Sequence, residues 1–186
     1  YPEFSIMLVA SMLMLTAHNI LNTYLLQIIQ SFGGSSSQLG IALAIQAIVE
    51  VPVLFSFSKL LKRFRARSLM LVAAFGFALK ALLYALSVSV LMVYMIQFTQ
   101  MISFAIFASA SVFYTAEVIA EEDQTTGQAF MTSMMTAGSV IGSLIGGWIL
   151  ELRGVRAMLS VNVLIAALGV AFAFVSVRHK SRSTPI

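Results

Sequence analysis

The amino-acid sequence predicts an all-α membrane protein in which six transmembrane helices form two inverted three-helix repeats. Three observations predict it: an apolar composition, apolar runs of membrane-spanning length, and a likeness between the two halves of the chain. Of the 186 residues, 60 % are hydrophobic and 10 % are charged, whereas roughly a quarter of the residues in soluble domains are charged. This composition excludes an ordinary soluble domain.

Each apolar run reaches the roughly 20 residues that a helix needs to cross a bilayer. Short breaks rich in glycine, serine or charged residues separate the runs. We therefore expect one domain, residues 1–186, whose spans cover residues 4–30, 38–59, 68–88, 90–118, 127–150 and 157–177.

The positions of the basic residues predict the orientation. They gather in Lys59–Arg67 and Arg178–Arg182, and Lys and Arg beside apolar spans are retained on the cytoplasmic side. We expect a multi-pass protein of the cytoplasmic (inner) membrane, with both termini and the Lys59–Arg67 loop in the cytoplasm. These flanks explain the net charge of +4, so the expected partner is the lipid bilayer and not nucleic acid.

Catalysis is not expected. The chain has no cysteine, which removes disulfides, thiolate metal ligands and thiol nucleophiles. It contains neither Gly-x-Ser-x-Gly nor His-Glu-x-x-His, and no aspartate pair at catalytic spacing. We predict that the protein is not an enzyme and has no catalytic residue, metal site or cofactor.

The first span becomes polar in its second half, where His18, Asn19 and Asn22 lie. These side chains either hydrogen-bond to neighbouring helices or line a cavity. Histidine also takes up and releases protons near neutral pH. Packing and proton coupling are therefore both open for this segment.

Glu50 and Lys80 are charged residues inside apolar spans. Gln46 lies one turn before Glu50 on the same helix face, and Pro52 predicts a kink. About 1.5 Å per residue puts Glu50 roughly 15 Å and Lys80 roughly 20 Å from the basic loop, so the two could meet. A lone charge at that depth costs about 3 kcal/mol, which favours either a structural ion pair or a proton or substrate site.

One face of the fourth span mixes amides, a hydroxyl group and aromatic rings. Spacings of three and four place these residues on it: Gln97, Gln100, Phe104, Phe107, Ser111 and Tyr114. The mixture suits a partly hydrated cavity that binds a solute with polar and apolar parts. The alternative is an ordinary buried helix face.

The fifth span carries glycines at four-residue intervals, Gly138, Gly142 and Gly146. Small residues at this spacing let two membrane helices approach closely. We predict that this stripe packs against another helix, either rigidly or as a surface on which helices slide.

Two sections of the chain look alike. Gln38–Gly40 before the second span parallels Thr126–Gly127 before the fifth, and Lys59–Arg67 parallels Trp148–Arg156. Because each unit has an odd number of spans, the second unit crosses the membrane in the opposite sense. That is the inverted repeat of many secondary transporters.

The segment Ser58–Arg67, Ser-Lys-Leu-Leu-Lys-Arg-Phe-Arg-Ala-Arg, lies in the loop between the second and third spans. Transporters of the major facilitator superfamily carry Gly-x-x-x-Asp-Arg-x-Gly-Arg-Arg in that loop, and here the Gly and Asp are missing. Over its whole length the chain resembles one six-helix half of such a transporter. The altered motif, a first residue other than Met and a basic tail resemble the C-terminal half, which implies a missing N-terminal six-helix half as partner.

Within the superfamily, three segments resemble the lactose permease-like branch: Glu50–Pro52, Lys80–Tyr84 and Glu117–Ala129. The resemblance implies that Glu50 matches a sugar-contacting glutamate and that Lys80 replaces an arginine near the proton site. Gln97 or Gln100 stands where that branch has a histidine, and no mid-helix carboxylate follows. Glu50 would then be the proton carrier of this half.

The function implied is secondary active transport of a sugar, nucleoside or aromatic acid, coupled to protons by alternating access. From the sequence and the resemblance together, we expect these residues to bind substrate or couple protons: Glu50, Lys80, Gln46, His18, Asn19, Asn22, Gln97, Gln100 and Tyr114. The alternatives are a drug or sugar efflux antiporter of the same superfamily, and a channel or other non-transport six-helix membrane protein.

Overall fold

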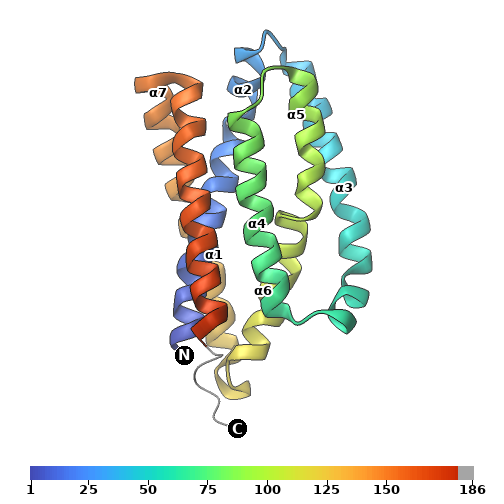
Figure 1. The fold of residues 1–186 in the computed structure, drawn as a ribbon, viewed down its shortest axis with the longest axis vertical. Coiled ribbons are helices and arrows are strands. Elements are labelled where there is room, and N and C mark those ends of the chain that lie inside the picture. The colour runs from blue at the N-terminus through green and yellow to red at the C-terminus, as the bar shows by residue number, and fades with distance from the viewer. Residues whose placement is uncertain (180–186) are drawn as a thin grey trace.

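The computed structural model describes residues 1–179, all of which lie in helices or the short turns between them. Its long helices run side by side along one axis (Figure 1). In chain order the elements are α1 (Pro2–Thr23), α2 (Leu25–Ser31), α3 (Ser36–Arg63), α4 (Ala66–Ala85), α5 (Val90–Gln97), the 3₁₀ turn η1 (Phe98–Met101), α6 (Phe104–Val118), the 3₁₀ turn η2 (Glu121–Asp123) and α7 (Gln124–His179).

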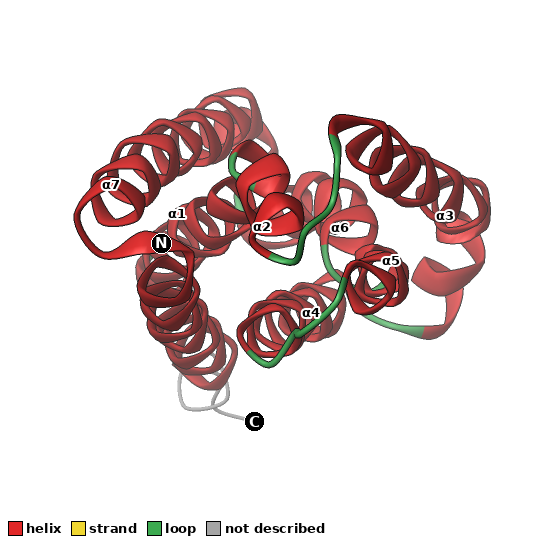
Figure 2. Cartoon of the chain, turned by 90° about the horizontal axis from the view of Figure 1, so that it is seen from above, coloured by secondary structure: helices red, strands yellow, loops and turns green. Residues whose placement is uncertain are grey.

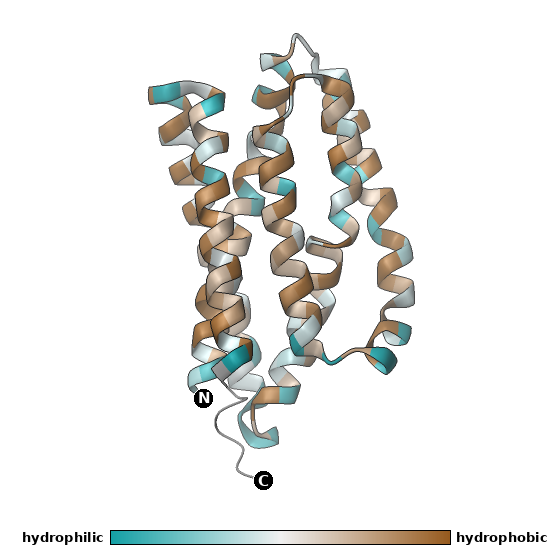
Figure 3. Ribbon diagram, in the orientation of Figure 1, coloured by the Kyte–Doolittle hydropathy of each residue, from teal (hydrophilic) through white to brown (hydrophobic). Residues whose placement is uncertain are grey.

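Five helical stretches of the described chain are long and apolar enough to cross a membrane: α1, α3, α4, the stretch from α5 to α6, and α7. The last of these makes two passes, because α7 doubles back at Gly154 (Figure 1), whose φ of 76° suits glycine. We call residues 124–153 its first arm and residues 155–179 its second arm. Apolar residues cover most of the helix surfaces, and hydrophilic residues concentrate near the helix ends (Figure 3). The all-helical membrane architecture is therefore confirmed, while the inverted repeat stays a prediction.

Helix α1 packs along α7 (Figure 2). The glycines of the first arm make this approach possible, since a Cβ at Gly138 would collide with the backbone carbonyl of Met12. At Gly142 it would come within 2.6 Å of the carbonyl oxygen of Thr16, and at Gly146 within 2.7 Å of the Tyr24 ring. Any larger residue in the stripe therefore separates α7 from α1.

Helix α3 lies at the edge of the bundle and has the lowest buried share of the five stretches (Figure 2). Several of its large apolar side chains are exposed, and Phe55 is 85 % exposed. Pro52 lies inside the helix and leaves the carbonyl of Ile48 without its usual donor. Helix α3 is thus the long helix held least by the rest of this chain.

The fourth predicted span, residues 90–118, matches one membrane-spanning stretch of the structure, but this stretch is not one regular α-helix. It breaks after Gln97 into η1 and a turn, and Ser103 has φ −99° and ψ −95°, outside the helical region. Gly76 of α4 accommodates the break, because a Cβ there would lie 2.5 Å from the carbonyl oxygen of Ile102. The Thr99 hydroxyl donates to the carbonyl of Ile96 and the Ser103 hydroxyl to the carbonyl of Thr99, a type of contact that favours helix bending.

Two other boundaries differ from the sequence prediction. The first span ends at Thr23, and Tyr24 separates it from the short helix α2. The Lys59–Arg67 segment is not a loop throughout, because α3 continues to Arg63 and α4 starts at Ala66. Lys and Arg are good helix formers, and cations are favourable at a helix C-terminus.

Candidate functional site

A chain of hydrogen bonds crosses the middle of the bundle from α4 to α3. The Lys80 ammonium donates to Oε1 of Gln100 at 2.6 Å, and Nε2 of Gln100 donates to Oε1 of Glu50 at 2.7 Å. Lys80 is 1 % exposed and Gln100 is fully buried, whereas Glu50 is partly exposed on α3. The central relay, as we call Lys80, Gln100 and Glu50, links a buried cation to a carboxylate at the bundle's edge.

The direct Lys80–Glu50 ion pair considered from the sequence does not form. Within residues 1–179 no carboxylate lies within 4.0 Å of the Lys80 nitrogen, and the Gln100 amide stands between the two charges. The amide presents its oxygen to the cation and its N–H to the anion, so both of its dipoles are favourably oriented. The break at η1 turns Gln100 toward both partners.

A second contact lies one helical turn from the relay. Nε2 of Gln97 donates to the Tyr84 hydroxyl at 3.0 Å, and both side chains are buried. Tyr84 follows Lys80 by four residues and Gln97 precedes Gln100 by three, so the two contacts form successive rungs between α4 and the α5–η1 segment.

Several buried polar atoms of this region have no hydrogen-bond partner within the described chain. They are Oε1 of Gln46, Oε1 of Gln97 and the hydroxyl of Tyr94. Gln46 lies one turn before Glu50 on α3, and α3 runs beside α5 (Figure 1). Buried polar atoms normally form hydrogen bonds with protein, water or a ligand. These atoms therefore indicate that water or a polar ligand can bind in the region around the relay.

His18 and Asn22 form a pair beside the relay. Nδ2 of Asn22 lies 2.8 Å from Nε2 of His18, and the imidazole stacks on Phe104 with ring centroids 4.7 Å apart. An edge contact with Phe77 completes the enclosure, while Nδ1 of His18 has no partner among the described residues. The His18 ring is thus enclosed mainly by two aromatic rings, one from α4 and one from α6.

Asn19 occupies a different environment. Its Nδ2 donates to the carbonyl of Ser139 at 2.6 Å and to Oγ of Ser143 at 2.7 Å. The nearby Tyr24 hydroxyl donates to the Ser143 carbonyl at 2.5 Å. The Asn19 amide group thus binds α1 to the first arm of α7, which is a packing contact, and its substrate or proton role stays a prediction.

Tyr114 also lies away from the relay, contrary to the sequence expectation. Its hydroxyl contacts the Glu3 carbonyl at 3.3 Å and Oγ of Ser176 at 3.2 Å, near the N-terminal end of α1. The break at η1 separates the two ends of the predicted stripe. Most residues between Gln100 and Tyr114 are buried in the chain's own core. The part of the mixed face that holds Phe107, Ser111 and Tyr114 therefore packs into the core of this chain, while Gln97 and Gln100 belong to the region of the relay.

The structure places an ion-pair cluster beside Tyr114 that the sequence did not predict. Arg67 binds Glu3 through two contacts of 2.8 and 3.2 Å, and its Nε contacts Glu117 at 3.1 Å. The three residues come from α1, α4 and α6, and Arg67 is 7 % exposed. Their separations of 50 and 64 residues carry no local sequence signal, so only the fold reveals the cluster.

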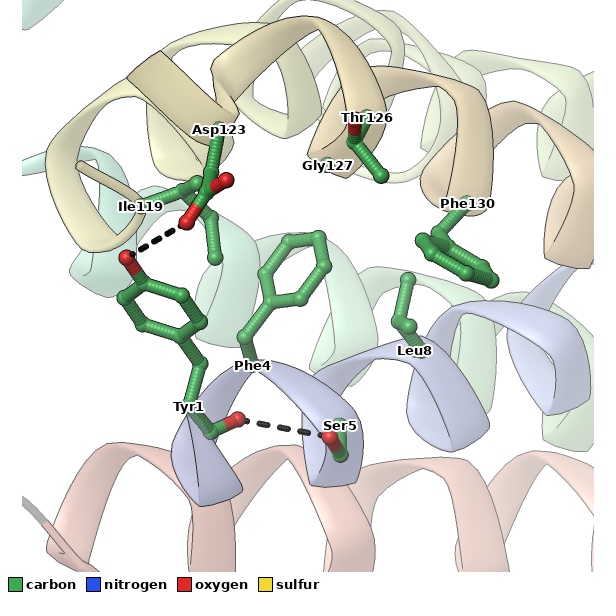
Figure 4. Close-up of a pocket in the computed structure, with 9 residues that line it drawn as sticks. All are labelled: Tyr1, Phe4, Ser5, Leu8, Ile119, Asp123, Thr126, Gly127 and Phe130. Carbon is green, nitrogen blue, oxygen red and sulfur yellow. Dashed lines mark hydrogen bonds between the residues drawn. The ribbon is translucent and has the colours of Figure 1, made fainter. Parts of the chain in front are cut away.

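A hollow of about 370 Å³ opens near the same end of the bundle, between the start of α1 and the start of α7 (Figure 4). Aromatic and aliphatic side chains form most of its wall, and the Tyr1 hydroxyl donates to Asp123 at 3.2 Å. None of the sequence-predicted site residues lines it. Among the described residues, no group of three His, Cys, Asp or Glu side chains is placed to hold a metal ion.

The central relay lies inside a bundle of membrane-spanning helices, and comparison with known proteins identifies the bundle. The model of the MFS_1 like family matches residues 1–161. The chain belongs to the MFS_1 like family. This membership supports a multi-pass membrane protein of the major facilitator type with a role in membrane transport, whereas the lactose permease-like branch stays a prediction. A comparison with curated proteins found no match.

Proposed function

We propose that this chain is the C-terminal half of a secondary active transporter that couples a small organic solute to protons. The observation that carries the proposal is the central relay, in which Glu50 is the carboxylate placed deep in the membrane-spanning part of the described chain. Intramembrane charges of this kind mark substrate and ion pathways. Membership of the MFS_1 like family supports transport by alternating access.

In this proposal Glu50 carries the proton. Its hydrogen bond from Gln100 is strongest while the carboxylate is charged, so protonation loosens the contact between η1 and α3. Helix α3 then moves with the absent N-terminal half, whose helices cover the apolar side chains that α3 exposes. Both termini and the basic segment at the α3–α4 junction face the cytoplasm.

The proposal is tested with the full-length protein in proteoliposomes that contain a pH-sensitive dye. We expect an inward proton gradient, with the outside more acidic than the vesicle interior, to drive accumulation of at least one solute from a panel of sugars, nucleosides and organic acids. Glu50→Gln abolishes this accumulation, and Glu122→Gln, which replaces an exposed acid in η2, leaves it unchanged. Accumulation that ignores both the pH gradient and Glu50→Gln would refute proton coupling through this residue.

A further inference from the structure

Lys80 is a buried cation that forms no ion pair with any carboxylate of residues 1–179. Its ammonium donates to the neutral oxygen of Gln100, and the nearest link to a negative charge is through that amide to Glu50. An ammonium group has three donors, and a buried charge is stabilised chiefly by an opposite charge with hydrogen bonds. Lys80 therefore has both the charge and the free donors to take up an anion.

Two amide oxygens near the relay indicate which further groups a bound ligand has. Oε1 of Gln97 lies on the rung next to Lys80, and Oε1 of Gln46 lies one turn from Glu50; neither has a donor within the described chain. Gln97 is fully buried. Amide oxygens accept hydrogen bonds. A ligand that binds to both of them therefore has hydroxyl donors in addition to its negative charge.

We propose that the site takes a small hydroxylated organic acid, whose carboxylate binds Lys80 and whose hydroxyl groups donate to Gln46 and Gln97. This inference rests on the proposed transport function and names its substrate class. A neutral sugar leaves Lys80 without an anion, and a plain fatty acid leaves both amide oxygens without donors. A hydroxylated acid satisfies both requirements.

Glu50 and Gln100 act as the latch over this site. Because Gln100 binds Lys80 and Glu50 at once, loss of the charge on Glu50 weakens one bond and frees the amide to release Lys80. Pro52 inside α3 removes one backbone hydrogen bond of the helix beside Glu50 and so provides local backbone freedom for Glu50 to withdraw. The other titratable groups of this region are His18 on α1, Tyr84 on α4 and Tyr94 on α5, while Gln97 of α5 and Gln100 of η1 contribute amides.

Charge balance links the proton to the acid. In the closed relay the charges of Lys80 and Glu50 cancel. A bound carboxylate adds one negative charge in a low-dielectric region, and a proton taken from water by the Glu50 carboxylate restores neutrality. One proton therefore enters with one carboxylate, and the carboxylate of the substrate stays ionised against Lys80.

The test measures binding to the purified full-length protein by thermal stabilisation, with two matched sets of probes. The six-carbon set is gluconate, hexanoate and sorbitol; the three-carbon set is glycerate, propionate and glycerol. We expect the hydroxylated acid of at least one set to bind more tightly than both of its relatives. Lys80→Gln weakens that binding about a hundredfold, Lys80→Arg weakens it less, and Lys59→Gln, an exposed site, has no effect.

Proton uptake on binding is measured with the same probes in weakly buffered solution. We expect the hydroxylated acid to take up about one proton per protein in the parent and none in Glu50→Gln. Preferential binding of sorbitol or glycerol, or no probe whose binding depends on Lys80, overturns the assignment of the substrate class. Neither result decides the proposed function, which is tested separately by solute accumulation under a pH gradient in the parent and in Glu50→Gln.

Discussion

Gln100 accepts a hydrogen bond from Lys80 over 2.6 Å, and both side chains are buried. The same amide donates to Glu50, so a single uncharged side chain connects the buried cation to the carboxylate at the bundle's edge. If Lys80 or Glu50 moves, the Gln100 amide cannot follow that partner and also keep its hydrogen bond to the other. A movement at one end of the relay therefore affects the hydrogen bond at the other end.

Replacing Gln100 with Leu is expected to lower the free energy of unfolding by about 2 kcal/mol, because Lys80 loses its acceptor in the core. Denaturation of the full-length protein in mixed detergent micelles measures the change. Gln30→Leu, at an exposed position of α2, is the control and is expected to have little effect. The double variant Lys80→Met, Gln100→Leu regains most of the loss; a double variant as unstable as the single one would contradict the role of Lys80.

Gly138→Ala is expected to destabilise the protein by about 1–3 kcal/mol, since the added methyl group meets the rigid backbone carbonyl of Met12. Gly40→Ala is the matched control, because nothing lies within 4 Å of its Cβ position and alanine favours a helix. The two variants are compared by the same detergent denaturation. Equal stability of both variants would show that α1 and α7 do not pack through this stripe.

Arg67→Gln is expected to cost about 2 kcal/mol of stability, because it leaves Glu3 and Glu117 beside each other without their cation. Arg65→Gln removes an exposed arginine and serves as the control. A double-mutant cycle of Arg67→Gln with Glu3→Gln isolates the pair, and we expect a coupling energy above about 1 kcal/mol. A coupling near zero would mean that the contact adds nothing to stability.

Asn19→Ala is expected to lower stability by about 1 kcal/mol or more through loss of its two bonds to α7. Transport kinetics separate this packing role from substrate binding: we expect the KM of the transported solute to stay unchanged. Tyr24→Phe, which removes the bond to Ser143, behaves in the same way. A large increase in KM for Asn19→Ala with normal stability would place Asn19 in the substrate site.

The sequence revealed the membrane architecture because apolar runs and their polar breaks are local signals. Glu50 and Lys80 were found for the same reason, since a charge inside an apolar run is visible without a fold. The bridging position of Gln100 was not visible, because it depends on the break at η1, which arises where Gly76 admits the carbonyl of Ile102.

The roles of other polar residues depended on three-dimensional neighbours in the same way. Asn19 and His18 are adjacent in sequence but face different helices, so one clamps α7 while the other stacks on Phe104. Arg67 was interpreted as one of several exposed loop cations, yet its partners Glu3 and Glu117 come from distant segments. Helical spacing shows which residues share a face, but not which helix that face meets.

The most direct test compares two modes of transport by the Glu50→Gln variant in proteoliposomes, with the solute that the panel identifies. We expect that the variant still exchanges labelled for unlabelled solute across the membrane, because binding and alternating access remain, but no longer accumulates solute in response to a pH gradient. A variant that accumulates solute under a pH gradient as the parent does would contradict the assignment of the proton to Glu50.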